Sequence, residues 1–320
     1  MIVAITGGTG FIGKKLVLRH LAQGDQVRVL SRQIPGEAGL PDSVVWCRGD
    51  LDASESLASF LEGADVLYHC AGEIRDTTRM EAVHVNGTRK LIGVATGRIG
   101  RWVQLSSVGA YGQRREGVIT EDTTLMPCGI YEETKVKSDV LVEAASSGAF
   151  QHVILRPSNV YGADMTNQSL FGLISMIQRG LFFYIGQPGA SANYVHVNNV
   201  VEGLLRCATM PAAQGNTYNI SDHCTMEEFV SIIAGALGKD APRMRLPEVP
   251  VRLLARLGGI LPGFPLTDAR VDALTNRAIY SNSKIERELD YRHVISMRDG
   301  LLELVDSWKR KAAVNTDAGK

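Results

Sequence analysis

The feature that most constrains the fold is a group of four glycines between an apolar run and a helical pattern near the start of the chain. Residues 2–5 are apolar and long enough for a buried strand, and residues 14–23 have the pattern of a helix. The glycines between them are Gly7, Gly8, Gly10 and Gly13. Glycines at this spacing allow a tight turn and the close approach of the backbone to a pyrophosphate, and the following helix N-terminus favours phosphate. We therefore expect a strand–turn–helix unit that binds a dinucleotide.

Strand-like and helix-like segments then alternate through the first half of the chain. The predicted strands are 2–5, 27–30, 44–46, 66–69, 102–105 and 153–155, and the predicted helices are 14–23, 54–62, 80–97 and one that starts near Tyr131. Repeated strand–helix units with apolar strands predict the α/β class, a doubly wound parallel sheet of the Rossmann type with helices on both faces.

The alternation ends after about Tyr161. Helices are predicted at 170–179, 200–208, 226–237, 249–257 and 297–309, and strands at 194–197 and 217–220. We expect a dinucleotide-binding domain over residues 1–160, to which 193–215 return. A smaller, interleaved substrate-binding lobe is expected over 161–311, followed by a disordered polar tail over 312–320.

Composition excludes several kinds of partner. The formal net charge is zero, so no nucleic acid and no anionic membrane surface is expected as a partner. Five widely spaced cysteines without a CxxC pair indicate reduced thiols and a cytoplasmic location. The apolar stretch 249–266 is interrupted by Arg252, Arg256, Pro262 and Pro265, so we expect a helix packed on the smaller lobe, with membrane contact as the alternative. His69, His84 and His196 are not spaced as metal ligands, and no metal is expected.

Three side chains form the candidate catalytic group. Tyr131 and Lys135 are four residues apart, so they share one face of a predicted helix. A lysine ammonium on that face is expected to lower the pKa of the phenol, as a tyrosine acid or base requires. Ser107 follows a predicted strand, which places its hydroxyl at the carboxyl edge of the sheet beside Tyr131.

Several segments together resemble a known family. In order they are Thr6-Gly-Gly-Thr-Gly-Phe-Ile-Gly13, Gly49-Asp-Leu51, His69-Cys-Ala-Gly72, Val85-Asn-Gly-Thr88, Leu105-Ser-Ser107, Tyr111-Gly112, Tyr131-x-x-x-Lys135, Leu155-Arg-Pro157, Asn159-Val-Tyr-Gly162 and Tyr194-Val-His-Val197. Over residues 1 to about 300 the sequence is similar to the extended short-chain dehydrogenase/reductases, the branch that includes UDP-galactose 4-epimerase and nucleotide-sugar 4-reductases.

The resemblance implies a role for each matching residue. The catalytic trio would be Ser107, Tyr131 and Lys135. The cofactor would be held by Gly7, Gly10, Phe11, Ile12, Gly13, Ser31, Arg32, Asp50, Leu51, Cys70, Ala71, Gly72 and Pro157, together with Tyr131 and Lys135. Asn86 would support two strands near the site. Asn159 would contact the sugar nucleotide, and Glu73 and Ser107 are further candidates for the substrate. Related enzymes often form homodimers through the helix after Asn86 and the helix of Tyr131.

The end of the second predicted strand bears on the choice of cofactor. An enzyme of this fold that uses NAD usually has an acidic residue there, which binds the ribose 2′-hydroxyl. Here Ser31 and Arg32 follow the strand, and Arg32 is able to pair with a 2′-phosphate. The sequence therefore favours NADP, with NAD as the alternative.

The function that the resemblance implies is a nucleotide-sugar epimerase or 4-keto reductase. In similar epimerases an arginine grips the diphosphate two residues before the Tyr-x-His strand, but this chain has Ala192, so Arg156, Arg179 or Arg277 would have to replace it. Two further departures are Asn199, where an acidic residue is usual, and Glu132, where glycine is common. An alcohol dehydrogenase or reductase for an apolar, 3β-hydroxysteroid-like substrate is therefore an alternative. A non-catalytic dinucleotide sensor is a third, disfavoured by the catalytic trio.

Overall fold

The computed structural model describes residues 1–51, 54–165, 169–258 and 267–317. Its centre is a seven-stranded sheet in the order β11-β7-β5-β4-β1-β2-β3, in which every neighbouring pair is parallel. The strands are β1 (Ile2–Thr6), β2 (Gln26–Ser31), β3 (Val45–Arg48), β4 (Val66–His69), β5 (Arg101–Leu105), β7 (Gln151–Pro157) and β11 (Asn216–Ile220). The doubly wound parallel sheet predicted from the sequence is confirmed. The strand order reverses between β1 and β4, which is where such sheets bind ligands.

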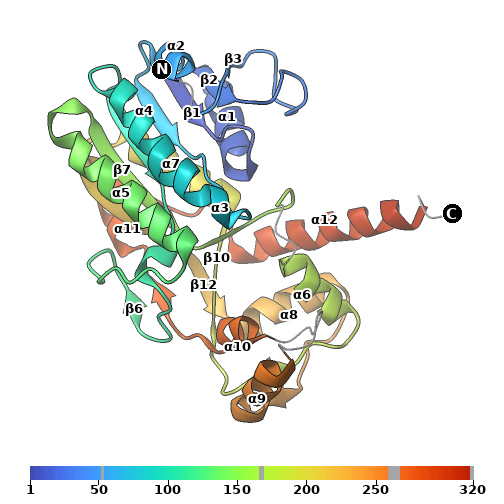
Figure 1. The fold of residues 1–320 in the computed structure, drawn as a ribbon. Coiled ribbons are helices and arrows are strands. Elements are labelled where there is room, and N and C mark those ends of the chain that lie inside the picture. The colour runs from blue at the N-terminus through green and yellow to red at the C-terminus, as the bar shows by residue number, and fades with distance from the viewer. Residues whose placement is uncertain (52–53, 166–168, 259–266, 318–320) are drawn as a thin grey trace.

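Helices cover both faces of this sheet (Figure 1). On one face lie α1 (Phe11–Ala22), α7 (Val197–Thr209) and α11 (Ser283–Leu289), and on the other α2 (Ser54–Leu61), α4 (Gly87–Ala95) and α5 (Ile130–Ala149). Leu16 of α1 and Leu204 of α7 are fully buried in one core, and Leu91 of α4 and Val142 of α5 in the other. Each such side chain contributes roughly 1.5–3 kcal/mol of burial free energy.

The helix predicted over 80–97 is interrupted by a wider turn. It consists of α3 (Thr77–Met80), the π-helical segment η1 (Glu81–Asn86) and α4. Asp76 caps its start by accepting a hydrogen bond from the Thr78 backbone N–H at 3.0 Å. A π-helical turn changes which residues face a neighbouring element, and such turns are frequent at functional sites.

The second half of the chain builds smaller sheets and a second helical layer. The strands are β8 (Asn159–Tyr161), β10 (Ser191–His196) and β12 (Asp222–Thr225) in one sheet, β9 (Tyr184–Ile185) with β13 (Arg245–Leu246), and β6 (Val118–Ile119) with β14 (Ile279–Tyr280). The helices are α6 (Ser169–Gln178), α8 (Met226–Ala236), α9 (Glu248–Gly258), α10 (Asp268–Thr275) and α12 (Met297–Asp317), and two 3-10 turns are η2 (Val108–Tyr111) and η3 (Pro211–Ala213). Phe229, Ile233 and Leu301 are fully buried in a core that joins α6, α8 and α12.

Two expectations about chain organisation need correction. The segment 312–317 is helical and not a disordered tail, because α12 continues to Asp317 and the segment starts with two alanines, which favour helix. Residues 318–320 lie outside the described part. The chain also returns to the large sheet at other places than 193–215. Strand β10 joins the smaller sheet, whereas α7, β11 and later α11 pack on or extend the large one.

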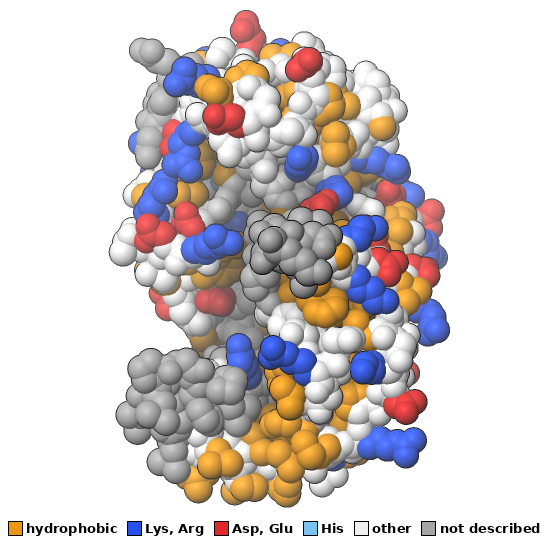
Figure 2. All heavy atoms as spheres, turned by 90° about the vertical axis from the view of Figure 1, so that its right-hand side faces the viewer, with side chains coloured by type: hydrophobic (Ala, Val, Ile, Leu, Met, Phe, Trp, Pro, Cys, Tyr) orange, Lys and Arg blue, Asp and Glu red, His pale blue; other side chains and the backbone are white. Residues whose placement is uncertain are grey.

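Helix α9 packs with only one face. Val251 and Ala255 are buried against the β9 and α10 side, as the sequence predicts for a helix packed on the lobe. Val249, Leu253 and Leu254 remain 80%, 59% and 56% exposed. Figure 2 shows hydrophobic side chains gathered at the lower end of the molecule, where Figure 1 places α9. Within the described ranges no helix combines the length and apolarity that crossing a bilayer requires. The rest of the apolar stretch, 259–266, lies outside the described residues.

Candidate active site

The glycine turn joins β1 to α1 at the reversal of strand order. Gly7 has a φ of +68°, and a Cβ there would meet the Ala71 backbone nitrogen at 2.7 Å. A Cβ at Gly13 would meet the carbonyl carbon of Gly7 at 2.8 Å and the Cα of Gly8 at 2.9 Å. The fold itself therefore requires glycine at positions 7 and 13, because the turn, α1 and the end of β4 approach so closely.

The turn also leaves room for an anion. Gly10 is exposed, and a Cβ there would have only the Gly7 carbonyl oxygen nearby, at 3.2 Å, among the described atoms. Gly10 is the N-cap of α1 and offers no side chain to the free N–H groups of the first turn. These N–H groups fit a pyrophosphate. The Phe11 and Ile12 side chains pack in the core, so only their backbone is available for this role.

The end of β2 carries the groups expected near the adenosine ribose. Ser31 is buried, whereas Arg32 is exposed. The Arg32 Nη1 atom lies 3.5 Å from Asp50 Oδ2 in an ion pair that the sequence did not predict. The Leu51 side chain is buried in the core, and its backbone N–H donates to Asp50 Oδ1 at 2.7 Å. A 2′-phosphate at this edge would therefore share Arg32 with Asp50.

The segment after β4 forms the other side of the glycine turn. The Ala71 backbone N–H donates to Thr6 Oγ1 at 3.2 Å, and Gly72 is exposed. Burial raises the pKa of the Cys70 thiol to about 12, so it is not a thiolate nucleophile at neutral pH. The Glu73 carboxylate accepts the backbone N–H groups of residues 74, 75 and 76 at 3.0, 2.9 and 3.2 Å, which lowers its pKa. Its contact with a substrate stays a prediction.

The candidate catalytic residues come from α5 and the end of β5. The buried Lys135 ammonium donates to the Leu105 carbonyl at 2.5 Å, two residues before Ser107. Ser107 caps η2, where its Oγ accepts the Gly109 N–H at 3.1 Å. A Cβ at Gly109 would lie 2.9 Å from Cγ of Glu132, so η2 packs directly against the first turn of α5, which carries the partly buried Tyr131. The structure thus brings the three residues to one end of the sheet.

The environment of Tyr131 differs from the sequence expectation. Burial, together with the negative charges of Glu132 and Asp139, raises the pKa of Tyr131 to about 12. The predicted lowering by Lys135 does not dominate, because the ammonium is bound to the Leu105 carbonyl while the phenol is removed from water. Burial also lowers the pKa of Lys135. With its pKa raised, the Tyr131 hydroxyl keeps its proton at neutral pH.

A buried ion pair anchors α5 to the sheet. The Asp139 Oδ2 atom accepts hydrogen bonds from Ser106 Oγ at 2.6 Å and from Arg156 Nη2 at 3.2 Å. The Arg156 Nη1 atom donates to the Tyr111 hydroxyl at 3.3 Å. Both charged side chains are at most 5% exposed, so this pair fixes the helix that carries Tyr131.

His84, which the sequence placed among structural histidines, lies at the centre of the site. It is 1% exposed, its Nδ1 lies 2.7 Å from Thr134 Oγ1, and its ring meets that of Tyr131 edge to face with centroids 5.6 Å apart. Burial and the Lys135 charge lower the pKa of His84 to about 4. The role near the site expected for Asn86 is wrong: Asn86 is exposed and accepts a hydrogen bond from Arg89, because η1 turns its side chain outward.

The residues expected near the nicotinamide and the substrate follow β7. Pro157 is buried at the end of that strand, and Asn159 is exposed. Ala192 is 1% exposed and packs in the core of the lobe. Of the arginines considered as replacements, Arg156 is held in the buried ion pair, and Arg277 donates to the Gln187 carbonyl at 3.0 Å. Arg156 is therefore not available to a diphosphate.

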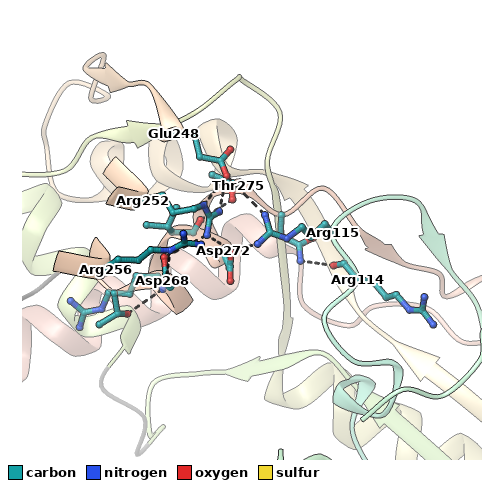
Figure 3. A network of polar contacts seen from close by, with 12 residues as sticks. Arg114, Arg115, Glu248, Arg252, Arg256, Asp268, Asp272 and Thr275 are labelled. Atoms are coloured by element: carbon teal, nitrogen blue, oxygen red, sulfur yellow. Dashed lines mark hydrogen bonds and ion pairs between the residues drawn. The ribbon is translucent and has the colours of Figure 1, made fainter. Parts of the chain in front are cut away.

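An ion network ties the segment after η2 to the helices of the lobe (Figure 3). The Asp272 Oδ1 atom of α10 lies 2.6 Å from Arg115 Nη2 and 2.8 Å from Arg252 Nη1 of α9. The Arg114 Nε atom donates to the Tyr111 carbonyl in η2 at 3.1 Å. The lobe is thereby linked to the turn that starts at Ser107. No group of three or more His, Cys, Asp or Glu side chains within the described ranges is arranged to hold a metal ion.

Comparison with known sequences places the chain among nucleotide-dependent enzymes. Residues 3–221 match the model of the NAD dependent epimerase/dehydratase family. A curated relative from Stigmatella aurantiaca, 4-hydroxy-2-methyl-3-oxo-4-farnesyl-3,4-dihydroquinoline-1-oxide ketoreductase, is 28% identical over 93% of each chain. The 3 beta-hydroxysteroid dehydrogenase/Delta 5-->4-isomerase of Mycobacterium tuberculosis is 28% identical over 94% of this chain and 88% of the relative.

Solved structures show the same fold. The UDP-glucuronic acid 4-epimerase of Bacillus cereus, in complex with NAD, superposes with a TM-score of 0.76 over 97% of this chain and 99% of that one, at 20% sequence identity. The doubly wound sheet with its second lobe is thus shared with enzymes of quite different sequence.

Proposed function

Because the chain belongs to the NAD dependent epimerase/dehydratase family, we propose that it is a nicotinamide-dependent oxidoreductase that interconverts a ketone and a secondary alcohol on an apolar substrate. One observation carries the proposal. The protonated Tyr131 phenol and the buried Lys135 ammonium share a helix face that meets the Ser107 turn, at the edge of the sheet where the glycine turn lies.

Each residue of the trio has a distinct task. Ser107 binds the substrate oxygen through its hydroxyl proton, since its oxygen already accepts from Gly109. Tyr131 donates its proton to that oxygen as the carbonyl becomes an alcohol. A nicotinamide dinucleotide, with its pyrophosphate held at the glycine turn, would be the source of the hydride for the carbonyl carbon. Lys135 holds the end of β5 in place and stabilises the tyrosinate that remains.

The proposed reaction is reduction of a ketone. It requires a protonated acid beside the substrate oxygen, and burial keeps the proton on Tyr131 at neutral pH. For the cofactor we propose NADPH, with Arg32 binding the 2′-phosphate, and NADH as the alternative.

The apolar substrate is supported by the site and by relatives. A diphosphate would need a cation. The position where similar epimerases have arginine is the buried Ala192, and Arg156 is paired with Asp139. The two curated relatives compared above are named for a farnesylated quinoline and for hydroxysteroids. A nucleotide-sugar epimerase or 4-keto reductase is the second candidate, favoured by the UDP-glucuronic acid 4-epimerase fold. It would need a cation such as Arg179.

The assembly and location are also part of the proposal. Helix α5 carries an apolar stripe of Val136, Val140, Leu141 and Ala144, and Val140 is 53% exposed, which suits a homodimer through α4 and α5. The cysteines of the chain are free thiols, which suits the cytoplasm.

The test combines one substitution with a substrate panel. Tyr131→Phe is expected to lower the rate of NADPH oxidation with a prenylated or steroid ketone by about 100-fold or more, while NADPH binding is retained. Tyr184→Phe, a tyrosine of β9 in the lobe, is the control and should match the parent. Turnover of a UDP-4-keto-sugar but of no apolar ketone would replace the substrate proposal by the second candidate. Full activity of Tyr131→Phe would refute the mechanism. A Tyr131→Phe variant that has no turnover but keeps all biological output would favour a dinucleotide sensor.

A further inference from the structure

His84 joins three segments that the mechanism needs in fixed positions. It lies in η1, between the segment after β4 and the first turn of α5. Its Nε2 accepts the Glu73 backbone N–H at 2.9 Å, and its Nδ1 faces Thr134 Oγ1 at 2.7 Å. A Cβ at Gly72 would lie 3.4 Å from the same Nε2. The imidazole therefore contacts both the segment expected to line the cofactor and the helix that carries the candidate catalytic residues.

The hydrogen bonds to His84 run in one direction. A backbone N–H can only donate, so the Nε2 that receives it carries no proton, and the proton of the neutral ring is on Nδ1. This Nδ1–H donates to Thr134 Oγ1. The Thr134 hydroxyl proton is then free to donate to the Ile130 carbonyl at 2.7 Å or the Tyr131 carbonyl at 3.0 Å. The chain of bonds runs from the Glu73 backbone to the backbone that carries the catalytic phenol.

The ring of His84 also contacts the phenol ring directly. The two rings are inclined by 81° with centroids 5.6 Å apart, the edge-to-face arrangement that aromatic pairs prefer. The imidazole is 1% exposed, and the Thr134 side chain is equally buried, so water does not replace these bonds when one is lost. Loss of either bond leaves a buried polar group without its partner.

We propose that His84 is a positioning residue with two separable functions: its Nδ1 side fixes the Tyr131 ring through Thr134, and its Nε2 side fixes the segment Gly72–Glu73 against the bound nicotinamide dinucleotide. The proposal rests on the proposed function in that Tyr131 is taken as the proton donor. It adds a residue that touches neither substrate nor hydride. Two conservative substitutions should separate these functions. One should lower turnover without weakening cofactor binding, and the other should weaken cofactor binding without lowering turnover.

The experiment measures kcat for ketone reduction and, separately, the Kd of NADPH by fluorescence titration. His84→Gln keeps an acceptor near the position of Nε2 and loses the donor to Thr134, so kcat should fall about tenfold with Kd within about twofold of the parent. His84→Asn keeps a donor near the position of Nδ1 and loses the acceptor for Glu73, so Kd should rise about tenfold with kcat nearly unchanged. His223→Asn, on the exposed edge strand β12, is the matched control and should change neither quantity.

A second variant tests the Tyr131 side if the histidine variants do not fold. Thr134→Val has nearly the shape of threonine and removes only the receiving hydroxyl, so it should lower kcat as His84→Gln does, and the double variant should lose no more than either single one. Equal effects of the Gln and Asn variants on kcat and on Kd, or parent values in Thr134→Val, would overturn the proposal. The proposed function fails separately, through full activity of Tyr131→Phe, whereas the effect on NADPH binding in His84→Asn is measured without turnover.

Discussion

Acidification is expected to destabilise the fold through His69, the last residue of β4. Its Nδ1 lies 2.7 Å from Thr6 Oγ1 and its Nε2 lies 2.9 Å from Thr88 Oγ1, and the ring is 1% exposed. Burial, with a smaller effect of the Lys135 charge, lowers the pKa of His69 to about 3 from its ordinary value of 6.5. As the pH falls, the unfolded chain therefore takes up the proton first, and stability is lost from about pH 7 downward through the folded-state pKa.

The magnitude follows from the two pKa values. At pH 5 the unfolded imidazole is almost fully protonated and the folded one is almost fully neutral. Proton uptake by the unfolded state then lowers the free energy of unfolding by RT ln(1 + 10^(6.5 − 5)), which is about 2 kcal/mol for the single His69 side chain. Less than about 0.2 kcal/mol of this is already lost at pH 7. A loss of about 2 kcal/mol is a large share of the stability of a typical domain.

Urea unfolding at pH 7 and pH 5, followed by tryptophan fluorescence, measures this loss. His69→Gln keeps a donor and an acceptor between the two threonines but has no titrating group, so its stability should fall by about 2 kcal/mol less than that of the parent between the two pH values. His223→Gln, at an exposed position of β12, is the control substitution. A parental pH dependence in His69→Gln would refute the assignment of a buried neutral imidazole.

Three further outcomes are expected. Asp139→Asn should lower the free energy of unfolding by about 3–5 kcal/mol in urea titration, because it leaves Arg156 charged and buried, and a combined replacement of both residues by leucine and methionine should recover most of it. Arg32→Ala should weaken NADPH binding by about tenfold or more in fluorescence titration and leave NADH binding within about twofold; equal weakening of both would contradict the proposed contact with the 2′-phosphate. Gly13→Ala should abolish dinucleotide binding measured by calorimetry, since its Cβ would overlap Gly7, and retained binding would show that the turn can widen.

The sequence was informative where short-range patterns carry the structure. The glycine spacing and the apolar runs predicted β1, the turn and the large parallel sheet, and the four-residue spacing placed Tyr131 and Lys135 on one face of α5. The strands β6, β8, β9, β12, β13 and β14 escaped prediction, because two to four residues in a strand leave no clear periodicity and their pairing is set by distant segments.

At the candidate active site, the side-chain directions and the pKa of Tyr131 differ from what the sequence predicts. Asn86 was expected to support the site and His84 to be an ordinary structural histidine, but the π-helical turn η1 directs the imidazole toward Thr134 and turns the amide outward. Helical periodicity cannot reveal an added residue in one turn. The pKa of Tyr131 was expected to be lowered by Lys135, and it is raised because burial outweighs a charge that is directed toward Leu105. Neither outcome has a signal in residue spacing.

The shared carboxylate of Asp272 has a mechanical consequence (Figure 3). The segment that carries Arg115 is also joined to the chain just after α10 through the backbone, since the Arg277 N–H donates to the Arg115 carbonyl at 2.7 Å and β14 pairs with β6. Asp272 therefore adds a side-chain contact between elements that the backbone already holds together. Any displacement of α10 relative to the large sheet is transmitted to the segment that follows η2, and so toward the turn that starts at Ser107.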